Sequence, residues 1–264
     1  MMMKHDNLPN SGKVQSFTIQ KWVSPRQRPD ERCAQSTRVD TELSFVSASL
    51  CLHERIISGA SDLVGVIESK EDYRFYLEAD RVALNIDSWW PRYFSHDIWR
   101  FERHLRRLEY WKNCRRSPVW RPIYYFLYWR FRRLSLRLGF SIPPNVFGPG
   151  LSIAHPGTLI VNDAARIGEN CRVHPGVTIG TAAGETHAAP RIGDNAFIGP
   201  NAVIIGPIEI ADDCAIGANA VVNRSFTEPG ITIAGVPARK VSSKGSKGLY
   251  QRSTHQVRQK RRDR

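Results

Sequence analysis

From residue 161 onward, aliphatic residues recur every six positions, and this spacing restricts the fold more than any other feature of the chain. The in-phase positions are Val161, Ile167, Val173, Ile179 and, after an interruption at 181–191, Ile192, Ile198, Ile204, Ile210, Ile216 and Val222. An α-helix has a period of 3.6 and a lone strand a period of 2, so neither gives this spacing. A hexapeptide repeat does, and it is typical of a parallel β-helix whose triangular coils each contain three hexapeptides.

The residues around these positions also fit a narrow coil. Four residues after the aliphatic position the side chain is usually small, as at Cys171, Ala196, Ala202, Cys214 and Ala220. Gly often follows the aliphatic residue, and we expect Gly or Asn at the corners of the coil, where positive φ is needed. An ordinary β-sandwich with accidental spacing would not give ten in-phase positions with a single break.

The net charge of +13 is unevenly distributed along the 264 residues. Residues 100–137 carry +10 and residues 239–264 carry +9, whereas the repeat region between them, 138–238, carries −4. The basic character therefore belongs to the flanks. A basic tail is usually a solvated, disordered end, and the alternative is contact with an anionic membrane or polymer. Nucleic acid is not an expected partner, because no recognition motif accompanies the charge.

The five cysteines are odd in number and scattered, and two of them occupy the small interior position of the repeat. This usage favours free thiols in a reducing compartment, so we expect a cytoplasmic protein without disulfides. No apolar run approaches the roughly 18 residues of a membrane span, and no signal-peptide pattern is present.

The part of the chain before the repeat predicts an α-helical domain at 66–140. Residues 1–65 are polar and lack periodicity, so we expect them to be disordered or to precede the true start near Val66. Helical patterning covers 70–84. A second helix, capped by Ser95 or Asp97, runs to about Cys114, and a third covers 119–138 after Pro118.

The third helix combines an apolar stripe with an arginine-rich face. The stripe comprises Trp120, Tyr124, Leu127, Phe131, Leu134 and Leu138. It predicts packing against neighbouring helices, although an aromatic and arginine-rich helix also suits peripheral contact with a membrane surface. Pro143 and Pro144 end the helical part. A β-helix at 141–241 and a basic, disordered tail at 242–264 complete the expected α+β architecture.

A stack of aliphatic residues has no chemistry of its own, so histidines that interrupt it are candidate site residues. His155 lies six residues before Val161, where the phase requires an apolar residue, and imidazole is a common general base near neutral pH. His187 lies in the interruption, where a loop leaves a rigid scaffold. His174, 19 residues after His155, is the third candidate. A hydrogen-bonded or solvated histidine without a catalytic role is the alternative for each.

Four stretches of the repeat region carry a more specific pattern: GLSIAHPGTLIVNDAARIGENCRVHPGVTIGT, PRIGDNAFIGPNAVIIG, AIGANAVV and AGVPARKV. Over residues 142–241 the chain resembles the serine O-acetyltransferase branch of the hexapeptide acyltransferases. The resemblance implies a left-handed parallel β-helix after a helical N-terminal domain. It also implies direct transfer of acetyl from acetyl-CoA to a hydroxyl, without metal, in a homotrimer or a dimer of trimers that binds acetyl-CoA between neighbouring β-helices.

By the same resemblance, His155 is the base that deprotonates the acceptor hydroxyl. His187 is the second active-site histidine, although it lies two residues further from Pro190 than the family pattern predicts. The pantetheine arm would lie along Gly180, Thr181, Gly199, Pro200 and Ala218. Arg239 would meet the phosphates of CoA, a role for which a guanidinium is well suited.

Two departures from the family concern the acceptor. The family usually has Asp directly before the catalytic histidine and another Asp fifteen residues before it, where this chain has Ala154 and Phe140. Those carboxylates orient the imidazole and hold the ammonium of serine, so Asp163 or Glu185 would have to replace them. The expected acceptor is L-serine or a related hydroxyl, and the alternative is a sugar hydroxyl of a surface polysaccharide.

Two other protein classes fit less well. A non-catalytic hexapeptide scaffold would be expected to lack both the coil histidine and the AGVPAR end. A β-helix carbonic anhydrase needs three zinc-binding histidines on facing coils, and His174 with His187 does not supply that pattern. We therefore expect an enzyme, an O-acetyltransferase.

Overall fold

The computed structural model describes residues 65–86, 96–184 and 188–263, all within the compact unit Cys51–Arg264. The helices are α2 (Lys70–Ala83), α4 (Asp97–Cys114), the 3-10 helix η1 (Pro118–Trp120), α5 (Arg121–Leu138) and α6 (Ser253–Arg262). The strands are β1 (Phe140–Ser141), β2 (Ser152–Ile153), β3 (Leu159–Val161), β4 (Arg166–Ile167), β5 (Arg172–Val173), β6 (Thr178–Gly180), β7 (Arg191–Ile192), β8 (Phe197–Ile198), β9 (Val203–Ile205), β10 (Glu209–Ile210), β11 (Ala215–Ile216), β12 (Val221–Val222), β13 (Thr232–Ala234) and β14 (Arg239–Ser242). Apart from Gly65, the segment 1–65, expected to be disordered, lies outside the described residues.

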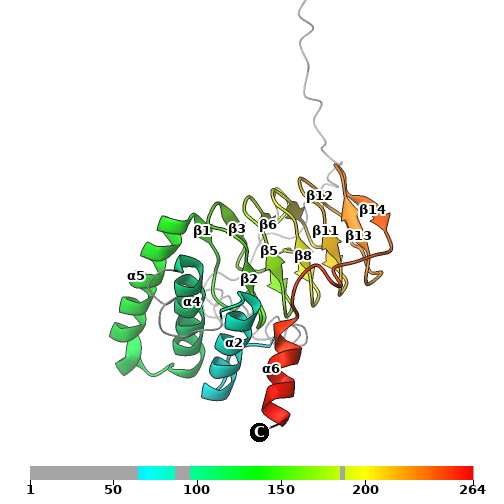
Figure 1. Ribbon diagram of the computed structural model, residues 1–264. Helices are drawn as coiled ribbons and strands as arrows, with labels where there is room; N and C mark the ends of the chain where they lie inside the picture. Colours follow the sequence, from blue (N-terminus) through cyan, green and yellow to red (C-terminus); the bar gives the residue numbers. More distant parts are fainter. Residues whose placement is uncertain (1–64, 87–95, 185–187, 264) are drawn as a thin grey trace, which may run out of the picture. The chain divides into compact units, whose positions relative to one another are not determined.

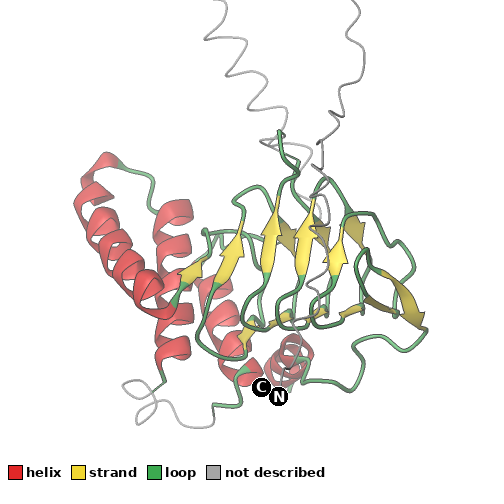
Figure 2. Ribbon diagram, turned by 90° about the horizontal axis from the view of Figure 1, so that it is seen from above, coloured by secondary structure: helices red, strands yellow, loops and turns green. Residues whose placement is uncertain are grey.

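The short strands form three sheets, and each sheet is one side of the coils (Figures 1 and 2). Their orders are β1-β3-β6-β9-β12, β10-β7-β4 and β14-β13-β11-β8-β5-β2. Each strand pairs in parallel with the equivalent strand one coil further on, as Val161 does with Ile179 and Ile179 with Ile204. Strand β14 instead pairs antiparallel with β13 and closes the last coil. The predicted parallel β-helix is confirmed.

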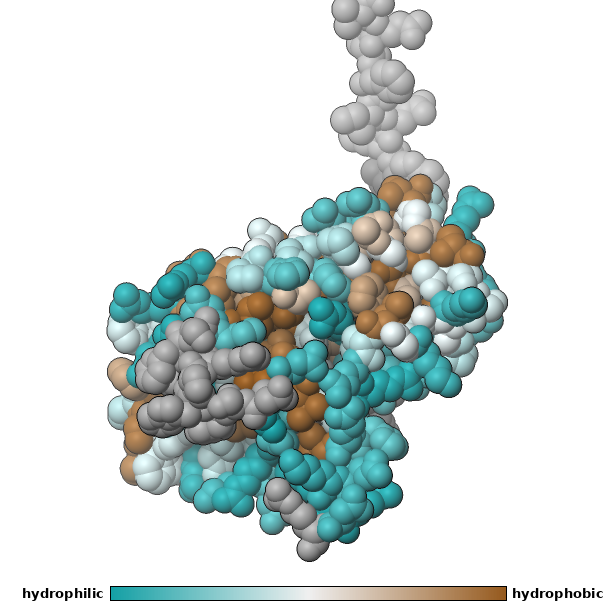
Figure 3. Space-filling model, viewed as in Figure 1, coloured by the Kyte–Doolittle hydropathy of each residue, from teal (hydrophilic) through white to brown (hydrophobic). Residues whose placement is uncertain are grey.

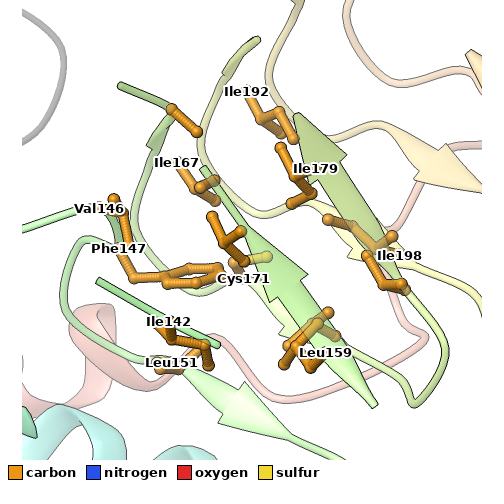
Figure 4. Close-up of a cluster of buried hydrophobic side chains, with 14 of the residues drawn as sticks. Ile142, Val146, Phe147, Leu151, Leu159, Ile167, Cys171, Ile179, Ile192 and Ile198 are labelled. Carbon is orange, nitrogen blue, oxygen red and sulfur yellow. The ribbon is translucent and has the colours of Figure 1, made fainter. Parts of the chain in front are cut away.

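The in-phase aliphatic residues point into the coils and form ladders along the interior (Figure 4). All ten positions from Val161 to Val222 are at most 3% exposed. The small residues beside them, such as Cys171 and Ala202, are buried as well and leave room for the neighbouring ladders. Because burying a Val or Ile side chain contributes about 1.5–3 kcal/mol, these ladders are a major source of stability.

The corners use Asn and Gly for different purposes. Side-chain-bearing residues with positive φ turn many of the corners, namely Asn145, Asn170, Asn195, Asn201, Asp213 and Asn219. The Gly that follows the aliphatic residue has ordinary φ, and at four positions it is required because the next coil lies very close, namely Gly168, Gly193, Gly199 and Gly217. At Gly199, an added Cβ would lie 2.8 Å from the amide nitrogen of Ala218. Asn therefore supplies the turn, and Gly permits the close stacking.

The helices precede the coils and end close to the predicted positions. Helix α2 begins at a capping box formed by Ser69 and Asp72. His96 is the N-cap of α4, in place of Asp97, while Ser95 lies outside the described residues. The predicted stripe of α5 is confirmed as a packing face. The centre of the Phe131 ring in this stripe lies 5.3 Å from the centre of the Phe101 ring in α4. In Figure 1, α5, α4, α2 and α6 lie side by side in that order.

Side chains of α2 and α4 complete the hydrogen bonding of the first coil, which has no preceding coil to pair with. Asp80 accepts hydrogen bonds from the backbone N–H groups of Gly150 and Leu151 at 2.8 and 2.9 Å. The Arg106 guanidinium donates to the Phe147 carbonyl at 2.9 Å and to Asp80 at 2.7 Å. Both charged side chains are fully buried. This ion pair thus caps the open end of the β-helix.

Two buried glutamates of α4 extend this cap. Glu109 accepts from the backbone N–H of Asn145 at 2.8 Å and from Arg106 at 3.0 Å. Glu102 accepts from the backbone N–H of Ile153 at 3.4 Å, while its Oε2 has no hydrogen-bond partner among the described residues. Burial raises the pKa of Glu102 well above its ordinary value, and the nearby Asp80 acts in the same direction. Burial therefore favours the neutral form of Glu102 over the charged form.

The C-terminal segment corrects the expectation of a disordered tail. Strand β14 ends at Ser242, and the following residues return along the Asn corners to helix α6, which packs against α2. Asn170 is the main anchor, because its side chain donates to Thr254 Oγ1 at 2.8 Å and accepts from the Thr254 N–H at 3.0 Å. Val257 is only 3% exposed. The corner amides and this apolar contact order a segment whose composition suggests only a solvated basic tail.

Candidate active site

His155 lies at the corner between β2 and β3, and its side chain is exposed. The prediction that it occupies an apolar phase is wrong. Ile153 and Val161 are eight residues apart, whereas their pairing partners Val173 and Ile179 are six apart. The interior position is filled by Ile153, and the two additional residues form a wider corner that carries His155 outward. The imidazole is thus accessible from solvent on a rigid scaffold.

His174 lies at the same corner on the next coil. The backbone N–H of Ala154 donates to the carbonyl of Val173 at 2.9 Å, which places the two corners side by side. His174 Nδ1 lies 2.9 Å from the Ile198 carbonyl oxygen. A carbonyl only accepts, so Nδ1 carries a proton and is the donor of this hydrogen bond. Burial lowers the pKa of His174, with Arg172 and His155 acting in the same direction.

The same edge of the β-helix continues past these histidines to the last coil. The Gly199 N–H donates to the Ile216 carbonyl at 2.8 Å, and the Asn219 N–H donates to the Pro200 carbonyl at 2.9 Å. Arg239 pairs with Ala234 on the last coil, and its side chain is exposed. Five strand-to-strand steps separate β2, which precedes His155, from β14, which carries Arg239. At about 4.8 Å a step, they span about 24 Å. The predicted residues His155, Gly199, Pro200, Ala218 and Arg239 therefore share one edge.

Gly180 and Thr181 lie at a different corner, where the chain leaves β6. Within one chain they are not brought together with His155. A Cβ added to Gly180 would meet no atom of the described residues within 4 Å, so no described neighbour requires glycine there. Asp163 is exposed at this second corner, and it therefore does not substitute for a carboxylate beside His155 of its own chain. His187 and Glu185 lie outside the described residues.

The two departures from the family pattern have a structural explanation. Phe140 is 4% exposed, and its ring lies 4.9 Å from that of Phe101, so it is a core residue at the junction with α4. Ala154 follows β2 directly and is half-buried. Neither position provides a carboxylate to His155.

A pocket of about 530 Å³ lies on the sheet formed by β4, β7 and β10, where Arg166, Arg191 and Glu209 line it. It includes neither His155 nor the other residues of the His155–Arg239 edge. A convex corner of a triangular coil cannot enclose a ligand alone, so a ligand bound there needs a second wall. In the described part of the chain, no group of three or more His, Cys, Asp and Glu residues is placed to hold a metal ion.

The chain consists of helices followed by coils of hexapeptide repeats. This architecture places it in the class of left-handed β-helix proteins built from hexapeptide repeats. In agreement, the family model for the bacterial transferase hexapeptide (six repeats) matches residues 189–224.

More specifically, the chain is similar to serine acetyltransferases. That of Mycobacterium tuberculosis is 34% identical over 102 residues, which cover 38% of this chain and 43% of that protein. That of Staphylococcus epidermidis is 34% identical over 111 residues, which cover 40% and 51%. The chain thus spans about half, or less, of the length of these curated relatives.

Solved serine acetyltransferases show the same relationship in three dimensions. The Neisseria gonorrhoeae structure has 29% sequence identity and a TM-score of 0.53, covering 66% of this chain and 68% of that one. The Brucella abortus structure in complex with coenzyme A has 26% identity and a TM-score of 0.54, covering 68% and 71%. The resemblance expected from the motifs is thereby confirmed in both sequence and fold.

Proposed function

We propose that this chain is an acetyl-CoA-dependent O-acetyltransferase in which His155 is the catalytic base. The observation that carries the proposal is the edge on which an exposed histidine lies at one end and an exposed arginine lies about 24 Å away, five strands further on. Gly199, Pro200 and Ala218 between them offer a surface for the pantetheine arm, and Arg239 is suited to the phosphates. The solved relative with coenzyme A bound supports this choice of co-substrate.

The chemistry needs one proton acceptor at the His155 corner. His155 removes the proton of the acceptor hydroxyl while the oxygen attacks the thioester carbonyl, so that a C–O bond forms. When the C–S bond breaks, the imidazolium returns the proton to the sulfur of CoA. His174, one coil further on, is fixed by its hydrogen bond to the Ile198 carbonyl and so holds the neighbouring corner in place.

We further propose that a second copy of the chain supplies the missing wall, in a homotrimer or a dimer of trimers. The convex His155 corner and the open space at Gly180 support this arrangement. In it, Gly180, Thr181 and the 181–191 loop with His187 would face His155 of a neighbour. A cytoplasmic location is part of the proposal, and the free thiols of Cys114, Cys171 and Cys214 support it.

A substitution at Gly180 tests the shared cleft. Gly180→Leu has room among the described residues of its own chain, so the variant is expected to fold and to sediment as a trimer. Its side chain would intrude on acetyl-CoA, and a displacement of 1 Å can cost about 10²-fold in rate. We expect kcat/KM for acetyl-CoA to fall by roughly that factor. A strictly monomeric wild-type protein with full activity would rule the arrangement out, as would a Gly180→Leu enzyme of unchanged activity.

The acceptor of the proposed reaction is L-serine or a related hydroxyl, in line with the names of the relatives. A sugar hydroxyl is the second candidate, and a specific observation favours it. Ala154 and the core residue Phe140 leave the ammonium of serine without a carboxylate next to the base. A buried charge without a partner is costly, whereas a sugar hydroxyl brings no such charge.

CoA release from acetyl-CoA, measured with L-serine and with a panel of sugars and nucleotide sugars, tests the function and the acceptor together. We expect weak activity on L-serine and higher activity on a sugar. Ala154→Asp should improve serine use by roughly tenfold to a hundredfold, because a charge-assisted hydrogen bond contributes about 1.5–3 kcal/mol. Ala211→Asp, at another corner, is the matched control and should not change it. A wild-type kcat/KM for L-serine of about 10⁴ M⁻¹s⁻¹ or above would refute the sugar preference, and no release with any acceptor would refute the function.

A further inference from the structure

Helix α5 exposes a row of large apolar side chains on the face opposite its buried stripe. Tyr125, Phe126 and Trp129 are 63%, 54% and 53% exposed, and Leu136 near the end of the helix is 68% exposed. Figure 3 shows brown side chains along the left edge, where α5 lies in Figure 1. Contiguous apolar surface of this kind usually marks a site of interaction with a protein or a membrane.

Arginines accompany these rings, and α5 contains no acidic residue. The Arg133 guanidinium lies 5.0 Å from the centre of the Trp129 ring, and that of Arg130 lies 5.9 Å from the Phe126 ring. The Phe126 and Trp129 rings stack on each other at 6.2 Å. We name these four side chains, together with Arg137, the aromatic–arginine face.

A shallow pocket of about 460 Å³ adjoins this face. Its lining includes Arg100, Arg130, Arg133 and Arg137, all cationic. Asp97 forms ion pairs with Arg100 at 3.1 Å and with Arg137 at 3.8 Å, and it offsets only part of this charge. The surface therefore combines exposed aromatic rings with a positively charged hollow.

We infer that the aromatic–arginine face docks on an anionic phospholipid bilayer. Aromatic rings favour the level of the lipid headgroups, and arginines beside them bind lipid phosphates. The contact is peripheral, because no helix in the described ranges is long and apolar enough to cross a bilayer. A second copy of this chain is a poorer occupant, since pairing the face with itself would oppose arginines with arginines and no carboxylate of α5 could relieve the repulsion.

Sedimentation of the full-length protein with lipid vesicles tests this inference. We expect binding to vesicles that contain phosphatidylglycerol, weak binding to pure phosphatidylcholine, and loss of binding at high salt. Inorganic phosphate at millimolar concentration should not compete, which distinguishes a bilayer from a free phosphate ligand. Equal binding to both vesicle types, or none to either, overturns the proposal.

Paired substitutions locate the surface. Arg130→Gln with Arg133→Gln should lower partitioning by roughly 25-fold, since each arginine near an anionic surface contributes about fivefold. Phe126→Ser with Trp129→Ser should lower it as well, with CoA release unchanged, because neither residue lies near His155 along the chain or in the coils. Two matched controls use residues exposed in the C-terminal segment. The control for the arginine pair is Lys244→Gln with Lys247→Gln, and the control for the aromatic pair is Val241→Ser with Leu249→Ser. Both should retain binding. If the aromatic pair instead splits a larger assembly in sedimentation velocity while vesicle binding persists, the face is an interface between copies and the inference is wrong.

Discussion

Replacing His155 with alanine is expected to lower kcat by roughly 10²–10⁴, the usual contribution of a general base. The acceptor hydroxyl would then lose its proton only to water. Acetyl-CoA affinity should change little, because the surfaces assigned to the co-substrate lie on later coils. Steady-state kinetics of CoA release with the best acceptor of the panel, together with calorimetric titration of CoA, would measure both quantities.

A matched control is available on α6, where His255 is exposed and far along the chain from the proposed site. His255→Ala should retain wild-type turnover. Because the His155 side chain is exposed, its removal should not alter folding, which circular dichroism can verify. Turnover of His155→Ala within a few-fold of the wild type would remove His155 from the mechanism.

Replacing Arg106 with methionine is expected to lower the free energy of unfolding by about 3–5 kcal/mol, as for other buried pairs that lose one partner. Methionine fills a similar volume, but it leaves the Asp80 and Glu109 carboxylates buried without their cation. It also leaves the carbonyls of Phe147 and Gly148 without a donor. The end of the first coil would therefore lose both its charge balance and its hydrogen bonds.

The pH dependence gives this prediction a distinct signature. Burial raises the pKa of Asp80 and of Glu109, and Arg106 opposes both shifts. Without Arg106 these pKa values rise further, so the folded variant binds protons more tightly than the unfolded chain. Its deficit relative to the wild type should shrink as the pH falls towards the ordinary carboxyl pKa of about 4. Denaturant unfolding at several pH values would show this, and Arg107→Met, exposed on the same helix, should stay within about 0.5 kcal/mol of the wild type. Equal stability of the two variants would contradict the capping role.

The β-helix was predictable because its register depends on residues that lie close together in the sequence. Six-residue spacing fixes which side chains enter the coil, and Val161, Ile179 and Ile204 stack as that spacing requires. The stripe of α5 was predictable for the same reason, since 3.6-residue periodicity selects one face. Of the site, Gly199, Pro200 and Ala218 were expected together from the family resemblance. Pro200 and Ala218 are 18 residues apart, which is one coil of three hexapeptides.

Other features depend on contacts between distant segments. The two extra residues at the His155 corner can be recognised only from the pairing of Ile153 with Val173. Counting back six residues from Val161 without them wrongly places the histidine in the interior of the coil. The C-terminal segment looks disordered by composition, yet the side chain of Asn170 anchors it. In the sequence, Glu102, Arg106 and Glu109 entered only the net charge of residues 100–137, and no structural role was predicted for them. Their spacing of four and three residues on one helix face was the available signal that they share a buried surface.

A crystal structure with coenzyme A bound would test the central claim, that the edge from His155 to Arg239 binds the co-substrate, most directly. We expect the sulfur beside His155, the pantetheine arm along Gly199, Pro200 and Ala218, and the phosphates at Arg239. Coenzyme A bound instead in the pocket of Arg166 and Arg191 on the β4–β7–β10 face, with the His155 edge empty, would contradict the account.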